Sequence, residues 1–328
     1  MAIKDFFTHD DRFDRFRWHP FTFELVGFAY AFFTIILIAF NLSEFADFKS
    51  MMALRVFYIE ATVAAFLIYF MRPTRFMLLL RVIIQMVFLS WWYPDTYELN
   101  RILPNLDHLF AACEQAVFSC QPSLLFSEYV PWGWFSELMC LGYVSYFPLM
   151  TLLLLYYFFR RYDELPMAAF IMLASFFAFY LIFIFLPVTG PQFYYLAVGT
   201  DNIANGLFPN IGDWFLTHSE RMAAPGWSDG FFYHLLDITH DAGERPTAAF
   251  PSSHVGITTV VLLLARRTHC RWLTFVILPF YVLMCLSTVY IYAHYAIDAI
   301  AGLLTGVLFY YIALRAYQWK ALHNNKFI

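Results

Sequence analysis

Two histidines in the second half of the chain have the neighbours that phosphoryl transfer requires. His254 closes the run FPSSH, in which Pro251, Ser252 and Ser253 are typical of the first turn of a helix. The first amides of a helix are unpaired and carry partial positive charge, so they form a ready site for an anion. The sequence therefore predicts an anion-binding helix start with an imidazole beside it.

His294 and Asp298 stand four residues apart in HYAID, on one face of a helix. A carboxylate one turn from an imidazole can hold one ring N–H, which fixes the tautomer and makes the other nitrogen a better nucleophile. We therefore expect His294 to attack phosphorus and form a phosphohistidine, while Asp298 orients it. His254 would protonate the leaving oxygen and then deprotonate a water or an alcohol.

Phosphate binding is expected close to these residues. Arg245 and the amides around Ser252 and Ser253 would hold phosphate oxygens, and Gln192 and Ser287 are further candidates for substrate binding. Two alternatives stay open: Ser252 could serve as a helix cap alone, and Arg245 could be a solvated loop charge. Two histidines and the helix ends supply both nucleophile and electrostatics, so we expect neither a metal ion nor a cofactor.

The composition indicates that a bilayer is the solvent of this chain. Of its 328 residues, 61% are hydrophobic and only 13% are charged, whereas soluble domains have about 25% charged residues. Apolar runs without the alternation of a barrel predict an all-α, polytopic transmembrane bundle of about eight spans. The expected spans are 21–42, 51–70, 76–92, 138–159, 167–187, 252–265, 272–292 and 293–317.

The distribution of Lys and Arg predicts the side that each loop faces. Fourteen basic residues fall on the side that bears both termini and five on the other side, with Arg81 inside a span. Both termini are therefore expected in the cytoplasm. The membrane would be a bacterial inner membrane or an endomembrane. The fourteen are Lys4, Arg12, Arg15, Arg17, Arg72, Arg75, Arg160, Arg161, Arg266, Arg267, Arg271, Arg315, Lys320 and Lys326.

Consecutive spans run in opposite directions, so the segments 187–195, 244–254 and 287–298 reach the same face, which is periplasmic or luminal. The span 252–265 is only about 21 Å long as a helix, against about 30 Å of hydrocarbon. Its start is therefore expected to be recessed below the outer boundary, which suits a substrate that stays in the bilayer.

PSSH together with S-x6-H-x3-D, from Ser287 through His294 to Asp298, resembles the last two signature motifs of the type 2 phosphatidic acid phosphatase (PAP2) superfamily. The resemblance covers about residues 187–304. It implies metal-independent phosphohistidine chemistry in a six-helix core, with His294 as nucleophile, Asp298 as its orienting acid, His254 as general acid and Ser252 as the motif serine. Residues 76–320 would form this core. Residues 21–75 would add two helices, and 1–20 and 321–328 would be tails.

The chain departs from the family pattern in two motifs. The first motif, a Lys followed by Arg-Pro, is absent from the end of the fifth span, where PVTGPQFYY carries Gln192, and Arg245-Pro246 lies just before PSSH instead. In the third motif Thr288 follows the serine, where the family has Arg. STVY followed by HY is similar to the inositol phosphorylceramide synthase branch, and HYAID is similar to the HY-x-x-D of sphingomyelin synthases.

Three functions follow as alternatives. The favoured one is a lipid-phosphate phosphatase, and the second is a phosphotransferase that moves a phosphorylated headgroup to a ceramide-like acceptor. A transporter without chemistry is disfavoured, because the chain shows neither repeated halves nor charges along a midplane path. The expected partners are a lipid phosphate and the bilayer, with no nucleic acid.

Cys113 and Cys120 share a loop and either pair or stay free, and His240 is expected to be solvated.

Overall fold

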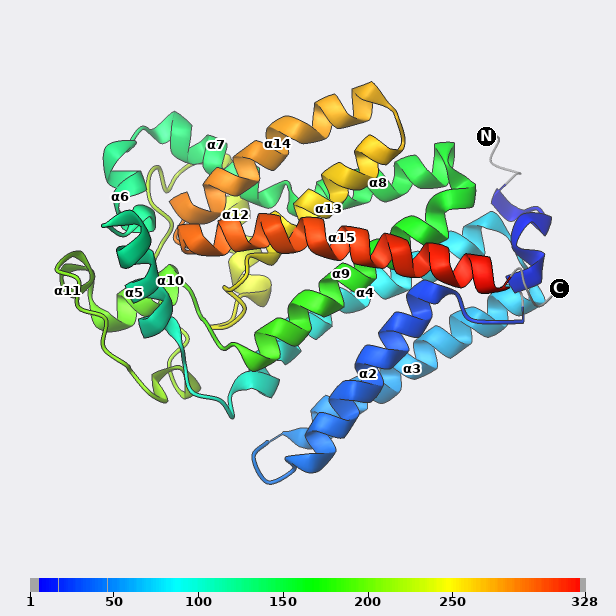
Figure 1. The fold of residues 1–328 in the computed structure, drawn as a ribbon, viewed down its shortest axis with the longest axis horizontal. Coiled ribbons are helices and arrows are strands. Elements are labelled where there is room, and N and C mark those ends of the chain that lie inside the picture. Colours follow the sequence, from blue (N-terminus) through cyan, green and yellow to red (C-terminus); the bar gives the residue numbers. More distant parts are fainter. Residues whose placement is uncertain (1–5, 17, 46, 325–328) are drawn as a thin grey trace. The chain divides into compact units, whose positions relative to one another are not determined.

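The computed structural model describes residues 6–16, 18–45 and 47–324, and within these ranges every regular element is a helix (Figure 1). The expected all-α fold is confirmed. The helices are α2 (Thr22–Phe40), α3 (Phe48–Met71), α4 (Arg75–Asn100), α5 (Asp107–Phe118), α6 (Pro122–Tyr129), α7 (Gly133–Val144), α8 (Tyr146–Arg160), α9 (Leu165–Phe185), α10 (Pro191–Val198), α11 (Thr200–Ala204), α12 (Phe231–Gly243), α13 (Ser253–Arg267), α14 (Arg271–Tyr290) and α15 (Ala296–Asn324). Three short 3-10 turns are η1 (Asp11–Phe16), η2 (Tyr162–Glu164) and η3 (Trp214–Leu216).

Six helices in the described ranges are long and apolar enough to cross a membrane: α2, α3, α4, α9 with η2, α14 and α15. The fourth expected span is not one helix. It is the pair α7 and α8, bent by 46°, and Pro148 in the first turn of α8 explains the break because it has no N–H for the preceding turn. The sixth expected span is α13, which has only 15 residues. A chain with this many apolar helices is an integral membrane protein.

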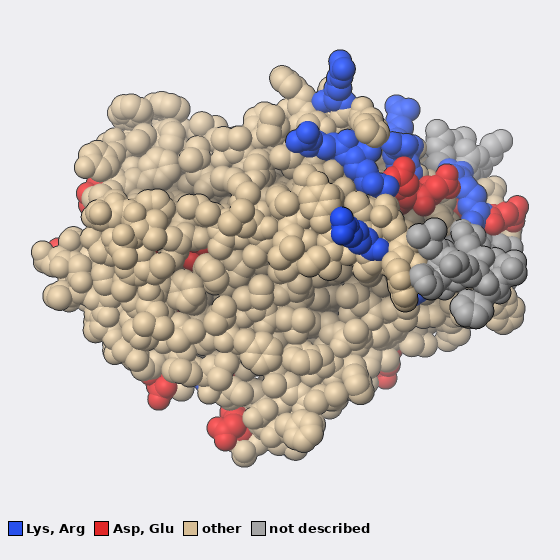
Figure 2. Space-filling model, viewed as in Figure 1, with Lys and Arg blue, Asp and Glu red and all other residues tan. Residues whose placement is uncertain are grey.

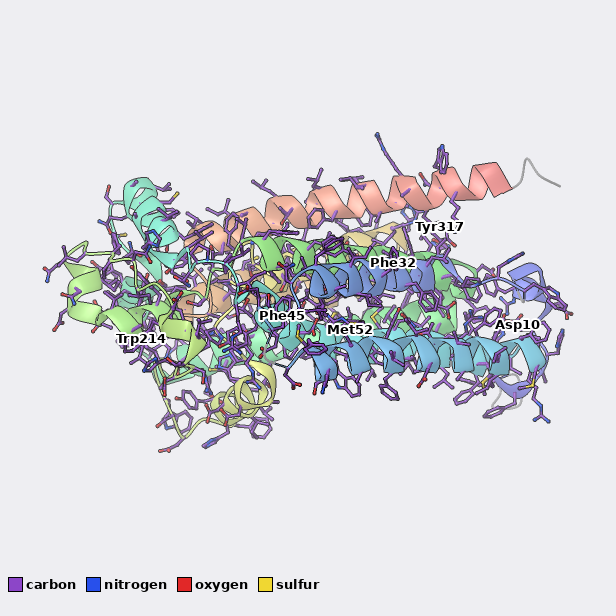
Figure 3. The ribbon with its side chains drawn as sticks, turned by 90° about the horizontal axis from the view of Figure 1, so that it is seen from below. Asp10, Phe32, Phe45, Met52, Trp214 and Tyr317 are labelled. Atoms are coloured by element: carbon purple, nitrogen blue, oxygen red, sulfur yellow. The ribbon has the colours of Figure 1, made fainter. Side chains whose placement is uncertain are left out.

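The outer faces of these helices carry large apolar side chains. Phe32 of α2 is 64% exposed and is labelled in Figure 3, and Phe57 of α3 and Phe275 of α14 are also exposed. Figure 2 shows that broad areas of the visible face carry neither Lys and Arg nor Asp and Glu. Such a surface is suited to contact with lipid chains.

Contacts divide the chain into two compact units, the first formed by Met1–Asp95, Leu152–Ala178 and Phe309–Ile328. Within this unit α2 and α3 lie side by side (Figure 1). Two buried ion pairs join them to α4: Arg55 of α3 pairs with Asp95, and Arg81 pairs with Glu24 of α2. Charges inside a membrane helix are costly without a partner, so these pairs fix the three helices against one another.

The second unit is Thr96–Thr151 with Phe179–Leu308, and it contains every candidate site residue. Its α13 and α14 pack against each other (Figure 1). A methyl group on Gly302 of α15 would lie 2.3 Å from the carbonyl oxygen of Ser252, so the start of α13 and the first turns of α15 touch backbone to backbone. One buried hydrophobic cluster of this unit contains Ala111, Leu124, Val188, Tyr194, Tyr195, Ile203, Ala249 and Tyr295.

Candidate active site

The first turn of α13 combines a helix cap with open amides. The Ser252 hydroxyl caps the helix by accepting from the Val255 N–H at 3.3 Å. The Ser252 N–H donates to the Asp298 carbonyl oxygen at 3.0 Å, which ties this turn to α15. Within the described ranges, no protein acceptor is found for the N–H groups of Ser253 and His254. These two amides can therefore bind an anion beside the His254 ring.

His294 lies in the turn between α14 and α15, and its ring contacts that of His254. The His294 Nε2 is 3.5 Å from the His254 Nδ1, and the ring centroids are 5.7 Å apart. The His294 Nδ1 lies 2.8 Å from the Ala249 carbonyl oxygen. A carbonyl only accepts, so Nδ1 carries the proton and Nε2 presents its lone pair toward His254. The structure thus brings together the two imidazoles that the motifs select.

Asp298 lies beside His294 without holding its ring N–H. The Asp298 Oδ2 accepts from the Tyr295 N–H at 2.9 Å and is 3.7 Å from the His294 Nδ1. The Ala249 carbonyl takes the ring proton that we expected Asp298 to hold. The Asp298 side chain is fully buried, and in the described part of the chain its Oδ1 has no hydrogen-bond partner. Asp298 can therefore act on a charged His294 ring through its negative charge.

Aromatic rings surround His254. Tyr143 stacks on it with 4.5 Å between ring centroids, and Tyr146 lies at 4.6 Å. Tyr143 also contacts His240, which is 5% exposed and not solvated as expected. Burial lowers the pKa of His240 to about 3, so its ring is neutral at physiological pH.

The expected phosphate ligands are only partly assembled. Ser252 and Ser253 lie at the helix start with His254, and the Ser253 hydroxyl hydrogen-bonds Tyr146. The buried Ser287 hydroxyl donates to the Met284 carbonyl of its own helix at 3.1 Å, so it is occupied there. Arg245 is exposed, and its guanidinium donates to the adjacent Glu244 carbonyl at 2.9 Å. Neither Arg245 nor Ser287 contacts either histidine in the described structure.

Glu244 is a site residue that sequence reasoning missed. Its carboxylate accepts from the Gln192 amide at 3.0 Å, and its charge acts on His294. Burial raises the pKa of Glu244, while the hydrogen bond from Gln192 opposes that rise. Burial lowers the pKa of His294 to about 4, against the hydrogen bond to Ala249 and the charge of Glu244. His294 is therefore neutral near pH 7, as a nucleophile must be.

Two acids of α5 accept hydrogen bonds from backbone segments next to the site. Asp107 accepts from the backbone N–H groups of Thr189 and Gly190, and Glu114 accepts from those of Ala296 and Ile297 at 3.0 Å each. Glu114 thereby caps the start of α15. No local pattern singled out either acid, because both lie in a stretch expected to be a loop, where acidic side chains are normally solvated.

Groups that could hold a metal ion are few at this site. Within the described ranges, no three or more His, Cys, Asp and Glu side chains are arranged to bind one. The cysteines of the described chain are free thiols, including the exposed Cys113 and the half-buried Cys120.

Comparison with known proteins identifies one family. A family model described as the PAP2 superfamily matches residues 107–312. No curated protein and no solved structure matches the chain. The matched range begins at Asp107 and includes His254, His294 and Asp298.

Proposed function

The chain belongs to the PAP2 superfamily, since the family match covers more than half of it, and from this premise we propose that it is a membrane phosphatase of lipid phosphates. Membership makes it an enzyme of the phosphatase or phosphotransferase type. One observation carries the proposal of a phosphohistidine mechanism: the His294 Nε2 lies 3.5 Å from the His254 Nδ1, beside the open amides at the start of α13.

In the proposed reaction the His294 Nε2 attacks phosphorus, and a nitrogen–phosphorus bond forms as the ester bond to the lipid oxygen breaks. A protonated His254 gives its proton to that leaving oxygen, so the lipid departs as an alcohol. Water then attacks phosphorus, His254 takes its proton, and inorganic phosphate leaves as the nitrogen–phosphorus bond breaks. The contact between the rings opens to admit the phosphoryl group.

Charge is balanced on both sides of the phosphoryl group. The amides of Ser253 and His254 hold its oxygens, and Asp298, 3.7 Å from the His294 Nδ1, stabilises the positive ring of the phosphohistidine. Arg245 stays a candidate phosphate ligand, because its guanidinium is exposed and donates to the neighbouring Glu244 carbonyl.

The site is proposed to open on the extracytoplasmic side of the membrane. The excess of Lys and Arg on the side of the termini supports this orientation. With 15 residues, α13 is about 22 Å long, and it ends at Arg266 and Arg267. If these two arginines mark the cytoplasmic boundary, His254 lies below the outer surface, where a lipid can reach it without leaving the bilayer.

Radiolabelled lipid phosphates given to the purified protein in detergent, with and without ceramide, test the proposal. We expect labelled inorganic phosphate in both cases. A labelled phospholipid-like product that forms only with ceramide would instead show a phosphotransferase. The variant His294→Ala should release no label, whereas His234→Ala, which changes an exposed histidine of α12, should keep wild-type turnover. Full turnover by His294→Ala would reject the mechanism.

A further inference from the structure

Asp107 is a fully buried carboxylate that no part of the proposed chemistry uses. Its Oδ2 accepts from the Thr189 N–H at 2.7 Å, the Thr189 hydroxyl at 2.9 Å and the Asn105 amide at 2.7 Å. Its Oδ1 accepts from the Gly190 N–H at 2.9 Å and the Tyr295 hydroxyl at 3.1 Å. Burying a carboxylate is costly unless its lone pairs are satisfied. These five bonds satisfy it and fix the loop before α10.

This loop connects Asp107 to the ring of His294 through the backbone. The Val188 carbonyl, one residue before Thr189, accepts from the Ala249 N–H at 2.9 Å. The Ala249 carbonyl in turn accepts from the His294 Nδ1 at 2.8 Å. Thus Asp107 fixes the loop, the loop fixes the peptide of Ala249, and that peptide fixes one proton of the imidazole.

The same loop also contacts the turn that carries His294. Gly190 has a φ of +91°, and a methyl group at its Cα would lie 2.7 Å from the Ala293 carbonyl oxygen. The Gln192 N–H donates to the Tyr292 carbonyl at 2.8 Å. The loop 188–190 and the turn that carries His294 are therefore in backbone contact. A shift of this loop would move both the Ala249 carbonyl and the His294 ring.

A carbonyl oxygen cannot donate, so only the Nδ1–H tautomer of His294 satisfies Ala249. Asp298 does not compete for this proton, because its nearer oxygen lies 3.7 Å from the His294 Nδ1, beyond hydrogen-bond distance. The tautomer leaves Nε2 as the basic nitrogen, and Nε2 is the atom that faces His254.

We propose that Asp107 is a positioning residue which, through the loop 188–190 and the Ala249 carbonyl, fixes the Nδ1–H tautomer of His294 and so selects Nε2 as the atom that is phosphorylated. The second half of this proposal depends on the phosphohistidine mechanism above. The first half concerns the resting protein and can be measured without any turnover.

The variant Asp107→Asn tests this role of Asp107. One carboxylate oxygen becomes an NH2 group, which cannot accept from the two or more donors that face it. The nitrogen-15 signals of the His294 ring, assigned by their loss in His294→Ala, should show the Nδ1–H tautomer in the wild type and a mixture in Asp107→Asn. With substrate, kcat should fall about 10²-fold, as for a catalytic group displaced by about an ångström, with KM nearly unchanged. Phosphohistidine trapped from this variant should include the Nδ1 isomer.

Asp201→Asn, which changes an exposed acid of α11, is the matched control and should behave as the wild type. A folded Asp107→Asn protein with wild-type ring signals and kcat overturns the proposal. If Asp107→Asn does not fold, Thr189→Ala, which removes a single donor to Asp107, decides by the same ring signals: a mixture of tautomers supports the proposal, and unchanged signals overturn it. Failure to trap any phosphohistidine from the wild type contradicts the proposed mechanism instead, and it leaves the tautomer measurement to judge the role of Asp107.

Discussion

The proton positions at the two histidines determine what each can do. The His294 Nδ1–H donates a hydrogen bond to the Ala249 carbonyl, so its Nε2 is an acceptor. The facing Nδ1 of His254 must then be the donor in the contact between the rings. The resting site thus already pairs a neutral nucleophile with a proton carrier. Removing one ring or the other should therefore stop the reaction at different steps.

The substitution His254→Ala should separate the two steps of the reaction. The aryl oxide of an aryl phosphate leaves without a proton from the enzyme, so the variant should still phosphorylate His294. The released aryl oxide takes its proton from water. Hydrolysis of the phosphohistidine needs a base, and turnover should fall by about 10²- to 10⁴-fold. Stopped-flow absorbance should therefore show a burst of aryl alcohol equal to the enzyme concentration, followed by a slow phase.

The companion variant His294→Ala should show no burst, because it has no nucleophile. His218→Ala changes a half-buried histidine that stacks on Trp214, and it should keep rapid steady turnover. If His254→Ala released aryl alcohol steadily at the wild-type rate, His254 could not be the base of the second step.

At this scale the sequence identified residue types better than it identified contacts. The spacing of His294 and Asp298 could be read directly, and both lie at the site. They do not share a helical face as expected, because His294 lies in the turn before α15. The partner of the His294 ring could not, because it is a backbone carbonyl 45 residues away, and any residue type supplies one. The direction of a flexible side chain such as Arg245 depends likewise on tertiary packing, and its guanidinium lies on a neighbouring carbonyl.

Among the helices, α5 has the clearest supporting role. Glu114 accepts from the first N–H groups of α15, which places a negative charge at the positive end of that helix. The carboxylate is nevertheless buried, and burial raises its pKa from 4.5 to about 7, partly offset by its bonds to Ile297 and Ala296. The folded protein therefore keeps a proton on Glu114 that the unfolded chain loses near pH 4.5.

Stability should consequently fall as the pH rises from about 4.5 to 7, and level off above it, because the folded state binds more protons in that window. The free energy of unfolding should drop by at most ~3 kcal/mol from this group. The variant Glu114→Gln cannot titrate, so denaturant unfolding in detergent should show a flatter pH profile. Glu128→Gln, at an exposed acid of α6, should keep the wild-type slope. Equal slopes for wild type and Glu114→Gln would contradict this assignment.

Apolar runs predicted the long helices because hydrocarbon permits few alternatives to a helix. The bend between α7 and α8 was missed, although Pro148 marks it, because hydropathy continues across the break. The stretches 93–137 and 188–251 were expected to be loops, yet they contain α5, α6, α10 and α12. These short helices are held by tertiary contacts such as those of Asp107, which join residues too far apart for any local pattern to show.

At the scale of the whole molecule, the family match and the compact units divide the chain differently, because the match also contains Leu152–Ala178 of the first unit. The match begins at Asp107, and the first unit ends its opening segment at Asp95. The start of the family core at residue 76 stays a prediction. Arg81 and Asp95 of α4 pair with Glu24 of α2 and Arg55 of α3. The partners in these pairs lie 57 and 40 residues apart, so sequence alone could not show them.

The orientation in the membrane can be tested with the native cysteines. Between Cys113 on α5 and Cys270 before α14 the chain crosses the membrane three times if the bent pair α7 and α8, α9 and α13 each span it. An odd number of crossings puts the two thiols on opposite sides. In single-cysteine variants, a membrane-impermeant maleimide should label the exposed Cys113 in intact cells and Cys270 only after permeabilisation. Labelling of both thiols from outside would mean an even number of crossings between them, and the reverse pattern would place the site in the cytoplasm.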